Sequence, residues 1–323
     1  MDFSLQGKEM TYLLYDLSNT HEFHRGAIRG AVASVNAEIQ SDTPIAVLVG
    51  SRNMIKFLPK IVFSKINCVV SLVGFGRLYT DYGFFGRFLF LSIVWIYAKT
   101  RALAFIVEHE SDKKVIEKVV KSDVYTTHGS GLDASSFFAI EKRRGPGLRL
   151  GYLSRFVASK GANEILRIAN RLPKDRELII AGWDVAGHKF ADAFQKIAEE
   201  RANITFLGKL HSRAEVSEFM NRIDLFLSPS VREGGNISLQ EAIWHEVPFV
   251  TTNVPGCDVL ANLFKCPAIP MAEFSDFILG DKVMEIHPDT SNWRERLTPF
   301  MSKSVEAELK TILTDVFQKT KQS

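Results

Sequence analysis

Several features are scarce in this chain of 323 residues, and each scarcity excludes a class of protein. The three cysteines are too few and too widely spaced for a disulfide framework or a zinc site, so we expect a reducing compartment. The first ten residues, MDFSLQGKEM, lack a basic region followed by an apolar stretch and predict no signal peptide. No G-x-G-x-x-G follows the first predicted strand, Thr11–Leu17, which disfavours a nicotinamide dehydrogenase.

Net charge is also scarce, at +3, but it is unevenly distributed along the chain. Residues 51–149 contain 16 Lys and Arg against 8 Asp and Glu. Such a basic region suits an anionic partner, which can be a membrane surface, a phosphorylated lipid or a nucleic acid. A solvated basic face with no partner explains the excess equally well. Because the sequence contains no recognisable nucleic-acid-binding module, we do not expect a nucleic-acid partner.

Short apolar segments alternate with amphipathic ones along the whole chain, which predicts parallel sheets covered by helices on both faces. The predicted strands of the second half are Leu148–Ser154, Glu177–Ala181, Asn203–Leu207, Asp224–Leu227 and Pro248–Thr252. Those of the first half are Thr11–Leu17, Pro44–Gly50, Asn67–Val73, Ala102–Val107 and Asp123–Thr127. Since 323 residues exceed one ordinary core, we expect two α/β domains, 1–147 and 148–304. The charged, Pro- and Gly-rich stretch Glu141–Gly147 is the predicted linker, and an amphipathic helix at 305–319 is expected to join the first domain.

The stretch SPSVREGGNISLQEAIWHEVPFV, residues 228–250, has two interpretations. Ser238 and Glu241 form S-x-x-E before an apolar run, which predicts a capping box. Alternatively, Glu233 lies in a loop at the carboxyl edge of the sheet, where it can accept hydrogen bonds from sugar hydroxyls. Gly234 and Gly235 then let backbone amides approach a ligand, and the following helix start favours a diphosphate.

A pair of cations follows the first strand of the second half. Arg155 and Lys160 lie in GYLSRFVASKG, residues 151–161. An Arg fork and a Lys point charge at a strand end make a suitable phosphate clamp. Taken alone, the same two residues are better explained as surface cations.

Together these motifs resemble the retaining GT-B glycosyltransferases of family four. The resemblance rests on Glu233-x7-Glu241 with the Ala, Pro and Gly that follow, and on the basic pair in place of that family's G-R-x5-K-G. It extends to IIAG at 179–182 and ITFLG at 204–208, and it covers roughly residues 149–258. His245 and Glu246 stand where glycine is usual, which is a small departure.

The resemblance implies a GT-B fold of two Rossmann-like domains facing a cleft, with a shortened first domain. It implies a UDP- or GDP-linked sugar donor, retention of anomeric configuration, and no metal or other cofactor; the chain has no D-x-D acid pair. Glu233 would contact the donor sugar, while Arg155 and Lys160 would hold the diphosphate and stabilise its departure. Glu241 would contact the ribose. The further donor-binding residues would be Gly182, Gly208, Leu210, Gly234, Gly235, Asn236, Ile237 and Ser238.

The implied reaction transfers a hexosyl-type sugar to a glycan or lipid-linked acceptor during bacterial lipopolysaccharide, O-antigen or capsule synthesis. A glycosyltransferase-like partner subunit without catalysis is the alternative, motivated by the short first domain. Acceptor-side candidates are His21, Arg25, Gly26, Arg29, His109 and His128. The first four lie in a stretch, 18–32, that resembles in position the family's glycine-containing loop. For His109 and His128 a structural or solvent-facing role is the preferred interpretation, so no catalytic histidine is assigned.

Two apolar segments with sparse cations, Asn53–Asn67 and Gly83–Lys99, bear on location. The second has at most 11 consecutive uncharged residues, Phe88–Ala98, which is too short to span a bilayer and favours a buried core helix. The first predicts an interfacial patch made of Lys56, Phe57, Leu58, Lys60 and Lys65. We therefore expect a cytoplasmic protein with peripheral contact to the anionic inner membrane face, where a lipid-linked acceptor would reside.

Overall fold

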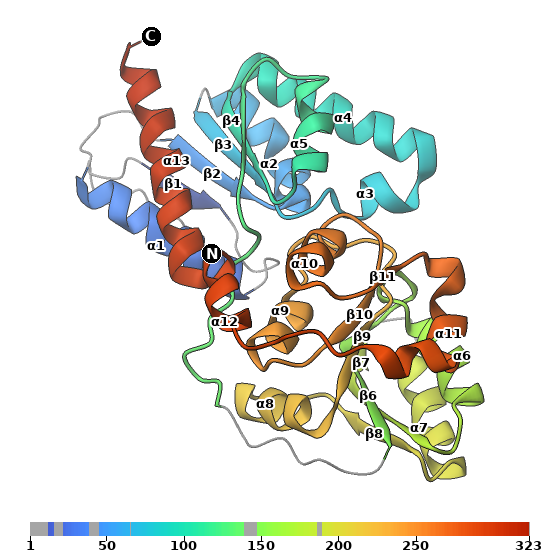
Figure 1. The fold of residues 1–323 in the computed structure, drawn as a ribbon. Coiled ribbons are helices and arrows are strands. Elements are labelled where there is room, and N and C mark those ends of the chain that lie inside the picture. The colour runs from blue at the N-terminus through green and yellow to red at the C-terminus, as the bar shows by residue number, and fades with distance from the viewer. Residues whose placement is uncertain are drawn as a thin grey trace. The chain divides into compact units, whose positions relative to one another are not determined.

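The computed structural model describes residues 12–15, 22–38, 45–64, 66–138, 147–185 and 189–322. The chain forms two compact units. The first unit comprises Met1–Asp133 and Pro299–Ser323, and the second comprises Ala134–Thr298. Each unit is built on a parallel sheet flanked by helices (Figure 1), so the predicted α/β class with two parallel-sheet domains is confirmed.

The first unit contains a five-stranded sheet in the order β1-β2-β3-β4-β5. The strands are β1 (Tyr12–Tyr15), β2 (Ile45–Val49), β3 (Asn67–Leu72), β4 (Ala102–Val107) and β5 (Asp123–Thr126). Successive side chains of a strand point to opposite faces, and Val47 and Leu48 accordingly belong to different core clusters. On the Val47 face lie α1 (Glu22–Glu38) and α13 (Ser302–Gln322). On the Leu48 face lie α2 (Ser51–Ser64), α4 (Gly83–Thr100) and α5 (Glu110–Glu117), with the short α3 (Gly76–Asp81) preceding α4.

The C-terminal helix α13 returns to the first unit and packs against α1 (Figure 1). Gly30 of α1 lies against the carboxylate end of Glu306 on α13. At the start of α13 the amide of Ser302 donates to the carbonyl of Leu132 at 2.8 Å.

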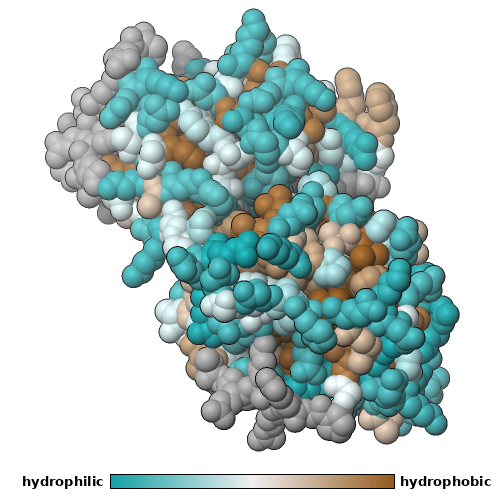
Figure 2. Space-filling view, viewed as in Figure 1, coloured by the Kyte–Doolittle hydropathy of each residue, from teal (hydrophilic) through white to brown (hydrophobic). Residues whose placement is uncertain are grey.

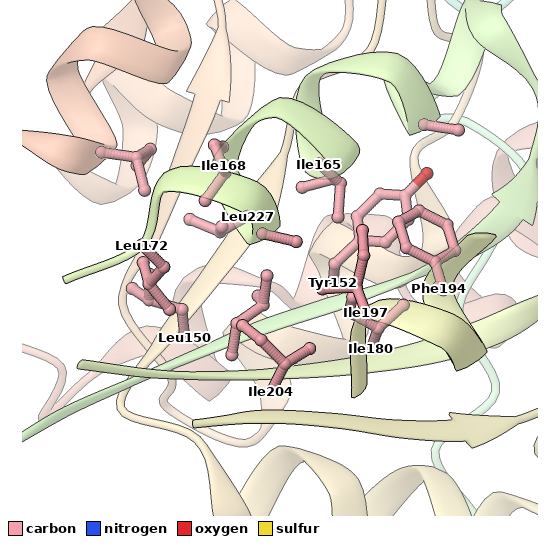
Figure 3. Close-up of a cluster of buried hydrophobic side chains, with 14 of the residues drawn as sticks. Leu150, Tyr152, Ile165, Ile168, Leu172, Ile180, Phe194, Ile197, Ile204 and Leu227 are labelled. Atoms are coloured by element: carbon pink, nitrogen blue, oxygen red, sulfur yellow. The ribbon is translucent and has the colours of Figure 1, made fainter. Parts of the chain in front are cut away.

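The second unit contains a six-stranded sheet in the order β11-β10-β9-β6-β7-β8. The strands are β6 (Leu148–Phe156), β7 (Arg176–Asp184), β8 (Ile204–Gly208), β9 (Leu225–Ser228), β10 (Phe249–Thr252) and β11 (Ala268–Ile269). The helices include α6 (Ala162–Arg171), α7 (Phe190–Glu200), α8 (Arg213–Arg222), α9 (Ile237–Trp244), α10 (Cys257–Phe264), α11 (Met271–Leu279) and α12 (Trp293–Arg296). Figure 3 shows side chains of α6 and α7 meeting those of β6, β7 and β9 in the core on one face. The strand order is that of a doubly wound sheet, and its direction reverses between β6 and β9.

The boundary between the units falls between Asp133 and Ala134, before the expected position at 147. Ring contacts explain the difference, because Phe137 packs against Trp244 and His245 with centroids 5.2 and 5.0 Å apart. The segment after Asp133 is thus held by the core of the second unit. Residues 141–146 of the predicted linker lie outside the described residues.

Candidate functional site

The reversal of strand order in the second unit brings the predicted basic pair and Glu233 to one place. In doubly wound sheets ligands bind at the carboxyl ends of the strands where the order reverses, which here is between β6 and β9. Arg155 lies at the end of β6, and Lys160 ends the short 3-10 turn that follows. Glu233 lies in the loop after β9. Residues 73 positions apart are therefore joined by topology alone.

Glu233 is held by two side chains. Its Oε2 forms an ion pair with Nζ of Lys160, and its Oε1 accepts a hydrogen bond from Oγ of Ser230 at 2.5 Å. The Glu233 side chain is buried, whereas the Lys160 side chain is partly exposed. A buried carboxylate requires such partners, since an unpaired buried charge is costly. The carboxylate is thus held in one orientation at the reversal point before any ligand binds.

The two loops that carry this pair are locked together by backbone contacts. Gly161 has a φ of +77°, and a Cβ there would lie 2.0 Å from the carbonyl oxygen of Pro229. The amide of Val231 donates to the carbonyl of Ser159 at 2.9 Å. On the β6 side, the Tyr152 hydroxyl donates to the carbonyl of Lys160 at 3.0 Å. Only glycine fits at position 161, which gives the Lys-Gly pair of the motif a structural reason.

The N-terminus of α9 is capped by Asn236, and the predicted capping box is wrong. Oδ1 of Asn236 accepts a hydrogen bond from the amide of Leu239 at 3.2 Å, so Asn236 is the N-cap. Ser238 lies inside the helix, two residues after the cap. Nδ2 of Asn236 donates to Oγ of Ser228 at 2.8 Å and contacts Sγ of Cys257 at 3.4 Å. The Asn236 side chain is therefore fully used in fixing the helix start, and a ligand would meet only backbone amides there. Those amides and the helix dipole favour an anion.

Glu241 lies on the second turn of α9, not on the first turn where it was expected. Burial raises the pKa of its carboxyl to about 8, and the charge of Arg213 opposes that shift. At pH 7 the group is consequently mostly protonated in the ligand-free protein, and a protonated carboxyl donates as well as accepts. Its predicted contact with a ribose stays a prediction.

Three side chains, Arg155, Trp183 and Lys209, lie at the ends of β6 and β7 and just after β8. Only Arg155 was predicted from the sequence. Arg155 and Trp183 are register partners in adjacent parallel strands, so their side chains lie on the same face. Nζ of Lys209 lies 5.4 Å from the centroid of the Trp183 ring. Among the described residues the Arg155 side chain has no ion-pair partner, and the indole is 40% exposed. In the sequence, the tryptophan that directly follows IIAG, Trp183, could have indicated this group of side chains.

The predicted donor-site glycines differ in what their surroundings require. Gly182 has a φ of +144°, and a Cβ there would lie 1.9 Å from the carbonyl oxygen of Ser154, so strand packing explains it. Gly208 has a φ of +67° with no atom within 4 Å of its Cβ position, so only the backbone conformation requires glycine. Leu210 follows Gly208 and is partly buried. Gly234 and Gly235 lie in the loop between Glu233 and α9, and Ile237 and Ser238 lie in the first turn of α9.

Polar residues after β9 and β10 complete the surroundings of Glu233 and were not predicted. Ser230 contacts Glu233 directly, and the Thr252 hydroxyl donates to the Ser230 carbonyl. Burial and the nearby Glu233 charge raise the pKa of the Cys257 thiol to about 12, so this thiol stays protonated. In the sequence, the serines of Ser-Pro-Ser at 228–230 could have indicated a hydroxyl partner for Glu233.

The acceptor-side candidates are scattered in the first unit. His21 lies outside the described residues, and the stretch that was expected to be a loop is helical from Glu22, which places Arg25, Gly26 and Arg29 in α1. His109 and His128 follow the paired strands β4 and β5. His128 Nδ1 lies 3.3 Å from Oε2 of Glu308 on α13, and this hydrogen bond raises the pKa of the imidazole. These contacts give His128 a structural use.

Within the described parts of the chain, no group of three or more His, Cys, Asp or Glu side chains could hold a metal ion. The three cysteines are buried and free.

Comparison with known proteins shows what this part of the chain is similar to. Residues 135–266 match the family model described as Glycosyl transferases group 1, and the match includes Arg155, Lys160, Glu233 and Glu241. The second unit is thus similar to this family over the matched residues. Protein CapJ of Staphylococcus aureus is 26% identical over 222 residues, covering 65% of this chain and 55% of the relative.

Solved structures show the same fold. A sucrose-phosphate synthase from Thermosynechococcus elongatus superposes with a TM-score of 0.68 at 13% identity, covering 92% of this chain and 80% of that one. Anabaena HepE in complex with UDP-glucose gives a TM-score of 0.67 at 13% identity, covering 94% and 99%. The chain therefore has the GT-B fold, and the predicted fold is confirmed.

Proposed function

We propose that this protein transfers a sugar from a nucleoside-diphosphate donor, UDP- or GDP-linked, to a glycan or lipid-linked acceptor. The observation that carries the proposal is the ion pair between Lys160 and Glu233 where the strand order reverses, beside the start of α9. A cation and a fixed carboxylate in contact match the two ends of such a donor, a diphosphate and a polyhydroxylated ring.

In this proposal each group has one role. Lys160, Arg155 and the first amides of α9 stabilise the negative charge that develops on the departing nucleoside diphosphate. Glu233 accepts hydrogen bonds from donor-sugar hydroxyls and is oriented for this by Ser230. The acceptor attacks from the face that the diphosphate leaves, so the anomeric configuration is retained. Neither a metal nor another cofactor is required, because protein cations neutralise the leaving group.

Donor binding divides the Lys160–Glu233 pair between two partners. The ammonium of Lys160 turns to the diphosphate, and Glu233 keeps its hydrogen bond from Ser230 while it receives sugar hydroxyls. Lys160 gains an anionic partner and Glu233 keeps hydrogen-bond donors, so neither charge is left without hydrogen bonds. The protein thereby exchanges one set of charge-assisted hydrogen bonds for another.

The proposed context is synthesis of a bacterial cell-surface polysaccharide such as lipopolysaccharide or capsule, in the cytoplasm. The similarity to CapJ and to HepE, whose structure contains UDP-glucose, supports this context. Free, buried cysteines are compatible with a reducing compartment. The resemblance to GT-B glycosyltransferases implies that the first unit, predicted as 1–147, binds the acceptor and that the second, predicted as 148–304, binds the donor, and we propose the same division here.

Thermal unfolding with UDP, GDP, ADP, CMP and the corresponding sugar nucleotides, without metal, tests the donor site. A nucleotide at 100 times its Kd stabilises the fold by about 2.7 kcal/mol, which raises the Tm by a few degrees. We expect one base to raise the Tm, and Lys160→Ala to remove the effect. Lys196→Ala is the matched control, since Lys196 is an exposed lysine that pairs with Glu200 on α7. A full Tm shift in Lys160→Ala would contradict the proposed role.

Catalysis is separated from binding by assaying sugar transfer or donor hydrolysis with the nucleotide that raises the Tm. Nuclear magnetic resonance of the product compares its anomeric configuration with that of the donor, and an inverted product would refute retention. A protein that binds the nucleotide but never releases the sugar, with lipid and glycan acceptors present, would be the inactive partner subunit.

A further inference from the structure

Helix α4 is apolar on two opposite faces, and only one of them is covered within the first unit. The inner face contributes Gly86, Phe90, Ile93, Val94 and Tyr97 to the core. The outer face exposes Phe84, Phe85, Phe88, Leu89 and Trp95. Positions 84, 88 and 95 fall within about 40° of one another around a helix, so the outer side chains form a continuous stripe. A helix that is apolar all round is normally buried on all sides, and this one is not.

The degree of exposure distinguishes this stripe from scattered surface residues. Phe84 is 86% exposed, Phe85 71% and Phe88 62%. Figure 2 shows tan side chains gathered at the edge of the first unit where Figure 1 places the start of α4. Contiguous apolar surface of this kind marks a binding face for a partner or a membrane.

Helix α2 adds positive charge to the same side of the unit. It shares a core cluster with α4, and the Tyr97 hydroxyl donates to the Met54 carbonyl at 2.8 Å. Residues four apart lie on one helix face, and Arg52, Lys56 and Lys60 follow this spacing on the exposed side of α2. Phe63 lies near the same line and is 84% exposed.

Neither α2 nor α4 contains an Asp or Glu, and the nearest acidic residue in sequence is Asp81 at the end of α3. Arg87 and Lys99 add two more exposed cations on α4. The sequence-based patch is corrected in part, since Phe57 and Leu58 are half-buried against the core, whereas Phe63 and the α4 stripe are exposed. Lys65 lies outside the described residues. The expected core helix at 83–99 is a core helix on one face only.

We propose that the outer faces of α2 and α4 dock on an anionic lipid bilayer. Aromatic side chains insert at the level of the headgroups while neighbouring lysines and arginines meet the lipid phosphates, which is the pattern of an interfacial helix. The charged side chains of α2 and α4 themselves are all cations, which favours contact with anionic headgroups. The contact lies along the bilayer surface, and no helix among the described residues is long and apolar enough to cross a membrane.

Sedimentation with vesicles tests the proposal directly. At low salt we expect the protein to bind vesicles containing phosphatidylglycerol at least tenfold better than vesicles of phosphatidylcholine alone. The triple variant Phe84→Ser, Phe85→Ser, Phe88→Ser should lose at least tenfold in binding, and so should Lys56→Glu, Lys60→Glu. Val259→Ser with Met284→Ser is the control, because it removes exposed apolar side chains of the second unit.

Trp95 reports insertion independently of sedimentation. Its fluorescence should shift to shorter wavelength with anionic vesicles, and Trp95→Phe should abolish the shift. Wild-type protein that ignores anionic vesicles at low salt, or a triple variant that binds as wild type does, would overturn the proposal. A wild-type dimer that the triple variant converts to a monomer without vesicles would assign the surface to a second copy instead.

Vesicle binding and nucleotide binding are measured in separate experiments, so one proposal can fail without the other. The triple variant should unfold at the wild-type temperature, since the removed rings are exposed, and should keep the Tm increase given by the nucleotide. Loss of that increase in the triple variant would show a folding defect, and the charge variant would then decide the lipid assignment. Failure to bind nucleotide would contradict the proposed transferase while leaving the lipid surface intact.

Discussion

The proposed donor site of the second unit is polar and internally paired, whereas the proposed lipid surface of the first unit is apolar and exposed. At the sheet edge of the second unit, Glu233, Lys160 and Ser230 are charged or polar, and each contacts another before any ligand binds. On the outer face of α4 in the first unit, the aromatic residues are exposed. Polar recognition in a buried site needs partners fixed in advance, because unpaired charge is costly. Apolar docking needs only surface, because the hydrophobic effect has no direction.

The most severe way to break the second unit's arrangement is to remove the charge of Glu233. Glu233→Gln keeps the shape of the side chain but loses the ion pair to Lys160 and the proposed acceptor of sugar hydroxyls. By analogy with removal of one stabilising group from an active site, we expect transfer to fall by about 10²–10³-fold. Steady-state assays measure the loss, and Glu200→Gln on α7 is the control. A decrease below threefold would remove Glu233 from the catalytic role.

Unlike Glu233, Glu241 is buried with a raised pKa, and the pH dependence of stability tests this difference. Burial raises the folded-state pKa of Glu241 from its ordinary value of 4.5 to about 8, so the folded protein binds the extra proton between these pH values. Stability from this group should therefore fall as pH rises from about 4.5 to about 8, by up to a few kcal/mol. Denaturant unfolding at several pH values measures the slope. Glu241→Gln should flatten it, and an unchanged slope would contradict the shifted pKa.

The loop lock around Gly161 can be broken without touching a charge. Gly161→Ala adds a methyl group against the Pro229 carbonyl in a left-handed backbone, and we expect a loss of about 2–5 kcal/mol. Gly208→Ala is the matched comparison, since its backbone is also left-handed but its Cβ site is open. It should lose only about 1–2 kcal/mol. Equal losses in urea unfolding would show that close contact at Gly161 is unimportant.

Two exposed tryptophans sharpen the comparison between the units. Trp183 lies beside Arg155 and Lys209 at the donor edge, and Trp95 lies on the outer face of α4. Trp183→Ala should weaken nucleotide binding about tenfold, because stacking of a base on an aromatic ring contributes about 1–3 kcal/mol. Trp95→Ala should leave nucleotide affinity unchanged and weaken vesicle binding. Calorimetry and sedimentation distinguish the two, and exchanged effects would refute both assignments.

The sequence predicted well where local pattern and topology agree. Apolar strands alternating with helices gave the parallel sheets, and the spacing of Arg155, Lys160 and Glu233 gave one site once those strands were neighbours. The N-terminus of α9 was misjudged because Ser238 and Asn236 are both good caps in a sequence. Only the contacts of Asn236 with Ser228 and Cys257 select between them. The division of the chain at Asp133 likewise depends on ring contacts more than 100 residues away in sequence.

Residue order alone determined the class of fold, the two-unit organisation and the chemical types gathered after β6 and β9, because periodicity and strand ends are local properties. Tertiary structure decided which groups meet, which carboxyl is paired and which is protonated, and which face of α4 stays exposed. Burial and pairing depend on residues distant in sequence, and a helix that is apolar on every side gives no local sign of which face the core will cover.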